Sequence, residues 1–339
     1  MSGNVCIEGL AYELGPHVVT SEWIEAQIAD TMERLWIPQG QIERMTGIKQ
    51  RRWWDAGIQP SEAATLAARK LIDQTGINPD EIGVLINSSV CRDYIEPSTA
   101  ALIHGNLKLS PRCMSMDIGN ACLGTISATQ TVSMMIDSGM INYGLIVCAE
   151  SSRDGIESTI KLLQSSQASM QDYKDNVASL TIGSGAVAML LTHKDRSRTG
   201  HTINGVVNLA ATEFNDLCVA TSKESMRTNT AALMTEGIAL AGRTWALASD
   251  TLANWSDDTI DRYVPHQVSV RQIEGMAKTM GISREKIQLN VETQGNMAAA
   301  ALPITLAQAA EEGTITTANH VGLLGIGSGL NCSMMSVTW

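Results

Sequence analysis

The sequence predicts an α/β protein in which helices cover mixed β-sheets. Short apolar runs typical of buried strands alternate with longer segments of helical periodicity, and this alternation continues through both halves of the 339-residue chain. A charged connector at residues 193–200 separates the two halves. A chain of this length ordinarily forms two domains, so we predict one at residues 1–195 and one at residues 196–339.

The first half carries five predicted strands and four predicted helices. The strands are expected at residues 5–10, 81–89, 113–116, 142–150 and 180–192. The helices are expected at residues 21–35, 61–75, 99–107 and 128–137. Thr20 or Ser21 is expected to cap the first helix, Ser61 to cap the second, and Gly76 to end the second. Residues 153–175 show no clean period, and we expect a mobile cap over a site there.

The second half repeats the alternation. Its strands are expected at residues 202–210, 260–265, 287–290, 321–326 and 332–338. Its helices are expected at residues 230–254, 268–280 and 298–312, and Gly281 is expected to end the second of them.

Composition narrows the functional classes. A net charge of −11 argues against a nucleic-acid partner, which needs a basic surface. We expect no secretory leader, because the first residues have neither a basic lead nor a long apolar core, and no apolar run is long enough to predict a membrane span. The seven cysteines are an odd number without a CxxC pair, which favours free thiols in a reducing cytoplasm over disulfides or a metal site.

Cys122 lies where a predicted strand turns into a predicted helix, and we expect it in the first helical turn. The positive end of a helix dipole favours a thiolate over a thiol. The small neighbours Gly119, Ala121 and Gly124 leave room for a substrate. This setting suits a nucleophile, and the alternative is a small buried hydrophobic residue.

Two later residues strengthen the nucleophile interpretation. His266 follows a predicted strand, 144 residues after Cys122, and Asn296 follows His266 by 30 residues. A cysteine with a distant histidine and asparagine is a known nucleophilic arrangement. Taken singly, His266 could be a core histidine and Asn296 a helix cap.

These residues make the chain resemble a thiolase-superfamily condensing enzyme of the ketoacyl synthase III type. The resemblance covers essentially the whole chain and is carried by Asn120-Ala121-Cys122, Pro265-His266-Gln267, Gly295-Asn296 and Gly325-Ile326-Gly327-Ser328-Gly329. It implies a thiolase-like fold with two similar βαβαβ-type halves in five layers, and a homodimer. It also implies a catalytic triad of Cys122, His266 and Asn296. The backbone N–H groups of Cys122 and Ser328 would stabilise the oxyanion.

A further motif resembles the OleA-type subgroup, which joins two fatty acyl-CoA molecules. The motif is Tyr94-Ile95-Glu96-Pro97-Ser98-Thr99-Ala100, and its glutamate precedes Cys122 by 26 residues. The resemblance implies that Glu96 is a base that reaches the active site from the partner subunit, and desolvation of its carboxylate would raise its pKa. The alternative is a glutamate that compensates a helix dipole.

Arg51 and Arg52 belong to the most basic cluster of this acidic chain. Guanidinium groups match phosphate geometry, so both could dock coenzyme A, and the resemblance favours this role. The alternative is a loop of surface ion pairs. Gln41 and Met45 replace a tryptophan and an arginine that are frequent in the family.

We therefore expect a cytoplasmic acyltransferase that needs no cofactor beyond its coenzyme A thioesters. Cys122 would be acylated by one fatty acyl-CoA and condensed with a second without decarboxylation, giving a 2-alkyl-3-oxo acid. One alternative is a decarboxylating ketoacyl synthase III that uses acyl-CoA and malonyl-acyl carrier protein. Another is a non-catalytic partner subunit of a synthase pair, although intact Cys122, His266 and Asn296 argue against it.

Overall fold

The computed structural model describes residues 3–222 and 225–339, and its largest feature is a mixed sheet. The strand order is β11-β12-β13-β8-β1-β7-β6-β4-β5. The strands are β1 Val5–Leu14, β4 Ile82–Asn87, β5 Met114–Asp117, β6 Tyr143–Glu150, β7 Gly185–His193, β8 His201–Ala210, β11 Arg262–Pro265, β12 His320–Gly327 and β13 Asn331–Thr338.

This sheet consists of two half-sheets that repeat one topology. In the first half, β5, β4 and β6 run parallel, β7 is antiparallel to β6, and β1 is antiparallel to β7. In the second half, β11 and β12 run parallel, β13 is antiparallel to β12, and β8 is antiparallel to β13. A parallel bridge from Tyr263 to Ile287 stands where the first half has β5. A short pairing of β1 with β8, at Cys6 and Ile7, joins the halves.

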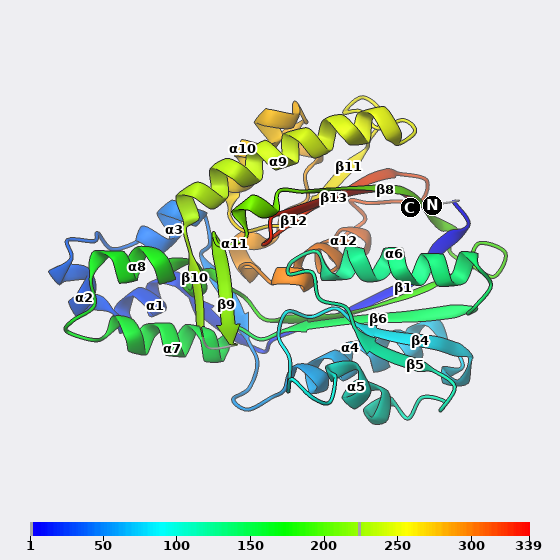
Figure 1. The fold of residues 1–339 in the computed structure, drawn as a ribbon, viewed down its shortest axis with the longest axis horizontal. Helices are drawn as coiled ribbons and strands as arrows, with labels where there is room; N and C mark the ends of the chain where they lie inside the picture. The colour runs from blue at the N-terminus through cyan, green and yellow to red at the C-terminus, as the bar shows by residue number, and fades with distance from the viewer. Residues whose placement is uncertain (1–2, 223–224) are drawn as a thin grey trace.

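Helices cover both half-sheets and fill the space between them (Figure 1). The outer helices of the first half are α4 Pro60–Thr75 and α5 Thr99–Leu107; those of the second are α9 Thr230–Thr251 and α10 Val270–Met280. The central layer consists of α6 Gly124–Asp137 and α12 Ala301–Glu311. The predicted α/β class and the five layers are confirmed.

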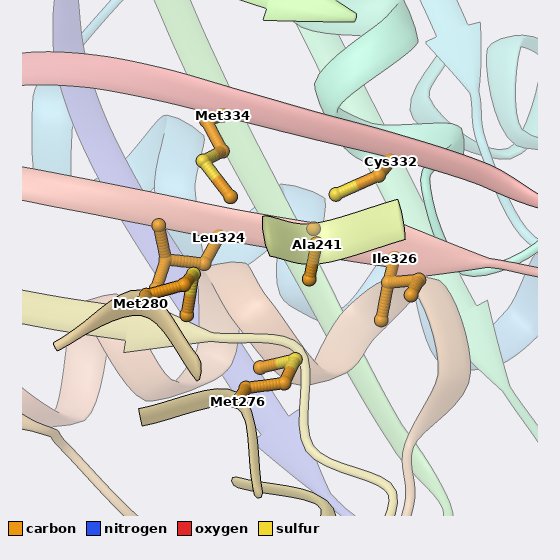
Figure 2. A pocket seen from close by; sticks show the side chains of 8 residues that line it. Ala241, Met276, Met280, Leu324, Ile326, Cys332 and Met334 are labelled. Atoms are coloured by element: carbon orange, nitrogen blue, oxygen red, sulfur yellow. The ribbon is translucent and has the colours of Figure 1, made fainter. Parts of the chain in front are cut away.

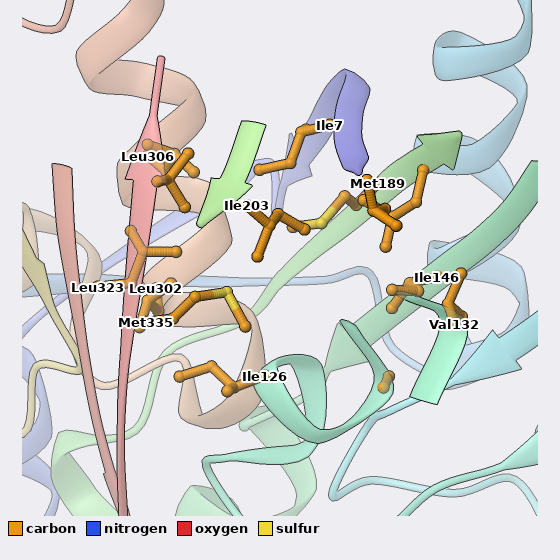
Figure 3. Packing of buried hydrophobic residues seen from close by; sticks show 14 of the residues in the cluster. Ile7, Ile126, Val132, Ile146, Met189, Ile203, Leu302, Leu306, Leu323 and Met335 are labelled. Atoms are coloured by element: carbon orange, nitrogen blue, oxygen red, sulfur yellow. The ribbon is translucent and has the colours of Figure 1, made fainter. Parts of the chain in front are cut away.

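The largest apolar core lies around the central helices. Figure 3 shows Ile126 and Val132 of α6 and Leu302 and Leu306 of α12 among side chains from both half-sheets. These side chains are buried, so the central layer is packed on both of its faces. This packing holds α6 in place, and α6 begins two residues after Cys122.

A lateral extension is built from short elements of the first half and one hairpin of the second. The elements are α1 Ser21–Gln27, α2 Ala29–Arg34, α3 Gln41–Thr46, α7 Arg153–Leu163, α8 Met170–Asn176, β2 His17–Thr20, β3 Gln50–Trp53, β9 Cys218–Ser222 and β10 Ser225–Thr228. Figure 1 shows the helices of this group and the β9–β10 hairpin together at one side of the molecule. Ile24 and Ile28 pack in one core with Ile156 and Ile160. The expectation of a mobile cap at residues 153–175 is therefore wrong, because two packed helices form there.

Several predicted boundaries differ from the structure. The helix expected at residues 21–35 is divided at Ile28, and Thr20 caps its first part by accepting from the Trp23 N–H. Gln59, and not Ser61, caps α4 in a capping box. Residues 287–290 form only a bridge, and the β9–β10 hairpin was not predicted. The strand expected at residues 113–116 is the edge strand β5, so it is less buried than we expected.

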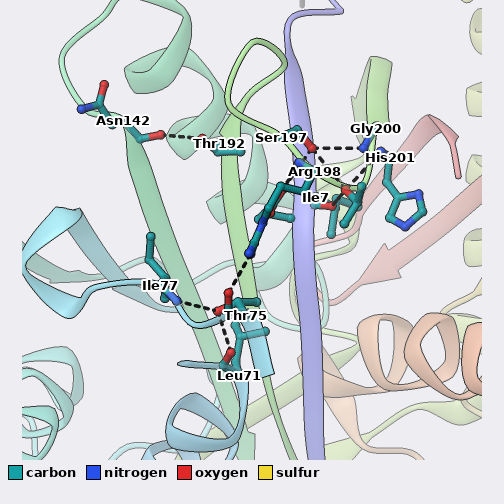
Figure 4. A network of polar contacts seen from close by, with 12 residues as sticks. Ile7, Leu71, Thr75, Ile77, Asn142, Thr192, Ser197, Arg198, Gly200 and His201 are labelled. Atoms are coloured by element: carbon teal, nitrogen blue, oxygen red, sulfur yellow. Dashed lines mark hydrogen bonds and ion pairs between the residues drawn. The ribbon is translucent and has the colours of Figure 1, made fainter. Parts of the chain in front are cut away.

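The connector between β7 and β8 is fixed by a buried carboxylate. Glu8 accepts hydrogen bonds from the Arg198 Nε at 2.7 Å, the Arg198 backbone N–H at 3.0 Å and Ser197 Oγ at 3.0 Å. Arg198 also donates to the Thr75 carbonyl at 2.7 Å, as Figure 4 shows. The predicted boundary between residues 195 and 196 falls in this connector. Because the halves share the central helices, the division into two domains stays a prediction.

Candidate active site

Cys122 lies in the turn between β5 and α6. The helix begins at Gly124, so Cys122 precedes it by two residues and is not in the first helical turn. Ala121 adopts a left-handed φ of 44°, which turns the chain sharply before the cysteine. A Cβ at Gly124 would stand 2.2 Å from the Ser88 carbonyl oxygen, so this close approach to the end of β4 requires glycine.

The Cys122 thiol is desolvated. Burial raises the pKa of Cys122 to about 12, and the charges of Glu150 and Cys218 add to the effect. Burial therefore opposes the effect of the helix dipole, and the expected thiolate is not favoured within the single chain. At neutral pH Cys122 carries a proton, and its attack on a thioester requires a base.

His266 follows β11 and is almost fully buried. Its backbone N–H donates to the Leu324 carbonyl of β12 at 2.7 Å. Neither ring nitrogen has a hydrogen-bond partner among the described residues. Burial lowers the pKa of His266 to about 4, so the imidazole is neutral and can accept or donate one proton. A buried and unpaired imidazole is costly, which points to a partner supplied by a substrate.

Asn296 is held by its backbone. Its N–H donates to the Thr181 carbonyl at 3.0 Å, and its carbonyl accepts from the Gly183 N–H at 2.9 Å. Its side-chain oxygen accepts from the Ala298 N–H at 2.9 Å, which orients the amide. The NH₂ group of the side chain makes no hydrogen bond within the described residues and is a free donor.

The elements that carry these three residues contact one another. A Cβ at Gly327, the last residue of β12, would stand 3.2 Å from the Cys122 nitrogen. The same strand, β12, also binds His266, because the Leu324 carbonyl accepts from the His266 backbone N–H. Thr125, in the first turn of α6, donates to the Ala299 carbonyl at 2.9 Å and so ties the Asn296 segment to the nucleophile helix. The structure thus brings the Cys122, His266 and Asn296 segments to one place.

Ser328 follows Gly327 in the turn between β12 and β13 and is partly exposed. Asn331, just beyond this turn, donates from its side-chain amide to the Asn120 side-chain oxygen at 3.2 Å. A polar hollow of about 290 Å³ adjoins this bond and includes Ser127 and Asn208 in its lining. The turn therefore lies against the nucleophile loop, and the oxyanion role of the Ser328 N–H stays a prediction.

Glu96 is exposed, on the loop between β4 and α5. Its carboxylate makes no hydrogen bond or ion pair within the described residues. The expected desolvated carboxylate is therefore not present within a single chain. The neighbouring Ile95 is fully exposed at 100%, so the loop presents an apolar side chain beside the carboxylate.

Arg51 is fully buried. Its guanidinium donates to Ser21 Oγ at 3.1 Å and to the Val19 carbonyl at 3.3 Å, and its Nε has no partner. Burial lowers the pKa of Arg51 to about 10. The expectation of an accessible Arg51, whether in a surface ion pair or in a phosphate dock, is wrong, because β3 turns this side chain inward. Arg52, the next residue of β3, lies on the opposite face of the strand and is half-buried.

Sequence reasoning missed two buried polar residues beside the site. Gln267 accepts from the Asn290 and Val291 N–H groups at 3.0 and 3.1 Å and donates to Thr305 Oγ1 at 3.1 Å. The only sequence signal for Gln267 was its position next to His266. Glu150 is the last residue of β6, and its only sequence signal was a single acidic residue at the end of an apolar strand.

Behind the site, methionines fill the space between the second half-sheet and its outer helices. Figure 2 shows Met276, Met280 and Met334 around Leu324 and Ile326. These side chains leave no room for a water molecule. This region is thus packed core and no open ligand site.

Within the described ranges, no three His, Cys, Asp or Glu side chains are grouped so as to hold a metal ion. No helix in the described part of the chain is long and apolar enough to cross a membrane.

The fold and the grouped cysteine, histidine and asparagine segments define a thiolase-superfamily condensing enzyme of the ketoacyl synthase III type. The family model described as 3-oxoacyl-[acyl-carrier-protein (ACP)] synthase III matches residues 116–207, and the model of its C-terminal part matches residues 251–339.

Full-length relatives identify the subgroup. The chain is 38% identical to the acyl-CoA:acyl-CoA alkyltransferase of Xanthomonas campestris pv. campestris and 37% identical to that of Shewanella oneidensis, with 99% of each chain covered. It is 27% identical to the beta-ketoacyl-[acyl-carrier-protein] synthase III of Staphylococcus haemolyticus, again over 99% of both chains.

Solved structures agree. A cysteine-to-serine variant of Xanthomonas campestris OleA with bound lauric acid and lauroyl-CoA matches with a TM-score of 0.97, 37% identity and 100% coverage of both chains. A cerulenin-bound form of the same protein matches with a TM-score of 0.96 over 99% of this chain and 97% of that one. The chain belongs to the OleA family of thiolase-fold acyltransferases.

Proposed function

We propose that this enzyme joins two fatty acyl-CoA molecules by a non-decarboxylating Claisen condensation. The product, after thioester hydrolysis, is a 2-alkyl-3-oxo acid. The observation that carries this proposal over a decarboxylating synthase is the position of Glu96. It precedes Cys122 by 26 residues, and in the solved OleA variants the replaced glutamate precedes the replaced cysteine by the same number.

In the first half-reaction, the Cys122 sulfur attacks the thioester carbonyl of one acyl-CoA. The thiol proton must leave, and the neutral, unpaired imidazole of His266 is the base at hand. The developing oxyanion accepts hydrogen bonds from the Cys122 and Ser328 N–H groups. The carbon–sulfur bond to coenzyme A then breaks, the proton passes to the leaving thiolate, and acyl-Cys122 remains.

In the second half-reaction, the thioester carbonyl of another acyl-CoA accepts hydrogen bonds from His266 and from the free side-chain NH₂ of Asn296. The Glu96 carboxylate of the partner subunit removes the α-proton, since no carbon dioxide is lost to generate the carbanion. The carbanion attacks the acyl-Cys122 carbonyl, and the Cys122 sulfur leaves and regains a proton. Water then cleaves the remaining thioester.

A homodimer is part of this proposal. β5 is the last strand of its half-sheet and has an open edge. Val90, Tyr94, Ile95 and Met114 expose apolar side chains on this edge and on the adjoining Glu96 loop. A second copy would cover these groups and desolvate Glu96.

The remaining parts of the proposal concern substrate delivery and compartment. Arg52 would contact coenzyme A phosphate, and the enzyme would need no cofactor beyond its thioester substrates. An acyl carrier protein is the alternative acyl donor. The seven cysteines are all free, which suits the cytoplasm.

Incubation of the enzyme with a long-chain acyl-CoA alone, followed by mass spectrometry, tests the function. We expect a 2-alkyl-3-oxo acid or the ketone formed by its decarboxylation. Acyl-enzyme or free fatty acid without a condensed product, together with condensation when malonyl-acyl carrier protein is added, would instead identify a decarboxylating synthase.

A further inference from the structure

Glu150 is a buried carboxylate that the proposed chemistry does not use. It is the last residue of β6 and is only 1% exposed. β6 lies between β4 and β7, so Glu150 stands at the carboxyl end of the sheet, beside the place where β4 leads into the Glu96 loop. A buried carboxylate without a cation is costly and is retained only where its hydrogen bonds serve a purpose.

Both oxygens of Glu150 hold the start of the Glu96 loop. Oε1 accepts from the Val90 N–H at 2.9 Å, and Oε2 accepts from the Cys91 N–H at 3.1 Å. Each oxygen thus accepts a backbone N–H, and these bonds oppose the burial that raises the pKa of Glu150. Glu150 therefore fixes the direction in which the loop leaves the sheet.

The same carboxylate lies near the opposite half of the site. The Ala299 backbone N–H, three residues after Asn296, is close enough to oppose the burial that raises the pKa of Glu150, and Cys148 of β6 packs in one apolar cluster with Ala299. Ala299 in turn accepts from Thr125 in the nucleophile helix. Glu150 is also close enough to Cys122 for its charge to raise the pKa of the thiol. One carboxylate thus binds the start of the Glu96 loop and lies close to both the Asn296 segment and Cys122.

We propose that Glu150 is a positioning residue that holds the Glu96 loop and the Asn296 segment in one arrangement, so that condensation depends on it more than acylation does. This inference rests on the proposed function. Glu150 is buried and accepts from the N–H groups of Val90 and Cys91, so it acts through the loop and not on a substrate. The Glu96 loop serves the partner's cysteine, and the effect of Glu150 should therefore appear in the partner's site.

The first test is Glu150→Gln. A glutamine keeps the size of the side chain, but its NH₂ group would face one of the N–H groups that the carboxylate now accepts from. We expect the rate of acyl-Cys122 formation to change by less than about threefold, and the condensation rate to fall on the order of tenfold to a hundredfold, as for a displaced catalytic group. Glu150→Asp keeps the charge and should restore part of the condensation.

Glu8→Gln is the matched control. Glu8 is also buried and also accepts a backbone N–H, but it holds the connector at Arg198 and contacts no residue assigned to the site. We expect this variant to lose thermal stability while keeping the ratio of condensation to acylation. An equal fall of both half-reactions in Glu150→Gln, without recovery in Glu150→Asp, would overturn the positioning role.

Subunit exchange locates the effect. One subunit carries Cys122→Ala with or without Glu150→Gln, and the other carries Glu96→Gln. The only complete site then combines the second subunit's Cys122 with the first subunit's Glu96. Condensation should be lower when the first subunit also carries Glu150→Gln, and equal activity of the two heterodimers would refute the inference. A wild-type enzyme that never condenses acyl-CoA would instead refute the proposed function itself.

Discussion

The buried imidazole of His266 should make the enzyme measurably sensitive to acid. Burial lowers the pKa of His266 from its ordinary value of 6.5 to about 4. A histidine whose pKa is lower in the folded state binds its proton more readily when the chain unfolds. The contribution of His266 to the free energy of unfolding is therefore fully favourable above pH 6.5, and it is lost as the pH falls from 6.5 toward 4.

The magnitude follows from the two pKa values. Each pKa unit corresponds to about 1.4 kcal/mol, and at pH 4.5 most of the interval has been crossed, so acidification costs about 2.5 kcal/mol through this residue. His266→Asn removes the titrating group. The loss of unfolding free energy between pH 7.5 and pH 4.5 should be smaller in this variant by about that amount.

Urea unfolding at the two pH values measures the difference. His17→Asn is the control, because the His17 side chain is 51% exposed and bonds Asp55 at the surface. We expect its acid sensitivity to remain close to that of the wild type. An identical loss of stability in the wild type and in His266→Asn would mean that the imidazole is not desolvated in the resting enzyme, and the neutral base proposed for acylation would lose its support.

Three further predictions concern the proposed mechanism. Cys122→Ala should abolish acylation detected by mass labelling with an acyl-CoA, whereas Cys113→Ala should affect packing; an adduct that persists in the first variant would exclude Cys122 as nucleophile. Glu96→Gln should still form the acyl-enzyme but lose condensation, and partial recovery in heterodimers with Cys122→Ala would place the base in the partner; full condensation by Glu96→Gln alone would remove it from the mechanism. Arg52→Ala should raise the KM for acyl-CoA, by a smaller factor at higher salt because salt screens the lost attraction, while Arg51→Ala should lower the Tm; the reverse pattern would contradict the buried position of Arg51.

Local signals predicted much of the fold. The helix at residues 99–107 has the predicted bounds, because Ser98 caps it by accepting from the Ala101 N–H. Gly76 and Gly281 end their helices in left-handed conformations, as expected. In each case the information lies within a few residues of the boundary, where sequence can supply it.

The features that sequence did not reveal depend on distant contacts. Arg51 is buried because β3 pairs with β2 and Ser21 receives its guanidinium, which no composition rule predicts. Residues 153–175 form helices because Ile156 and Ile160 pack against apolar side chains of α1 and α2. The thiolate expected at Cys122 is not favoured within the single chain, because the local dipole was weighed without the desolvation that the folded chain imposes.

The repeated topology explains how residues so far apart in sequence reach one site. Glu96 lies in the loop after β4, and His266 directly follows β11, the strand that holds the same place in the second half. Cys122 follows β5, and Asn296 follows the bridge at Ile287, which replaces β5 there. Each half thus delivers its groups from the carboxyl ends of equivalent parallel strands, where ligand sites form in open α/β sheets. In the proposed mechanism the second half supplies donors for carbonyl oxygens, and the first half supplies the nucleophile and the base. Because the proposed base, Glu96, lies on an exposed loop, this mechanism requires a second copy of the chain to complete the site.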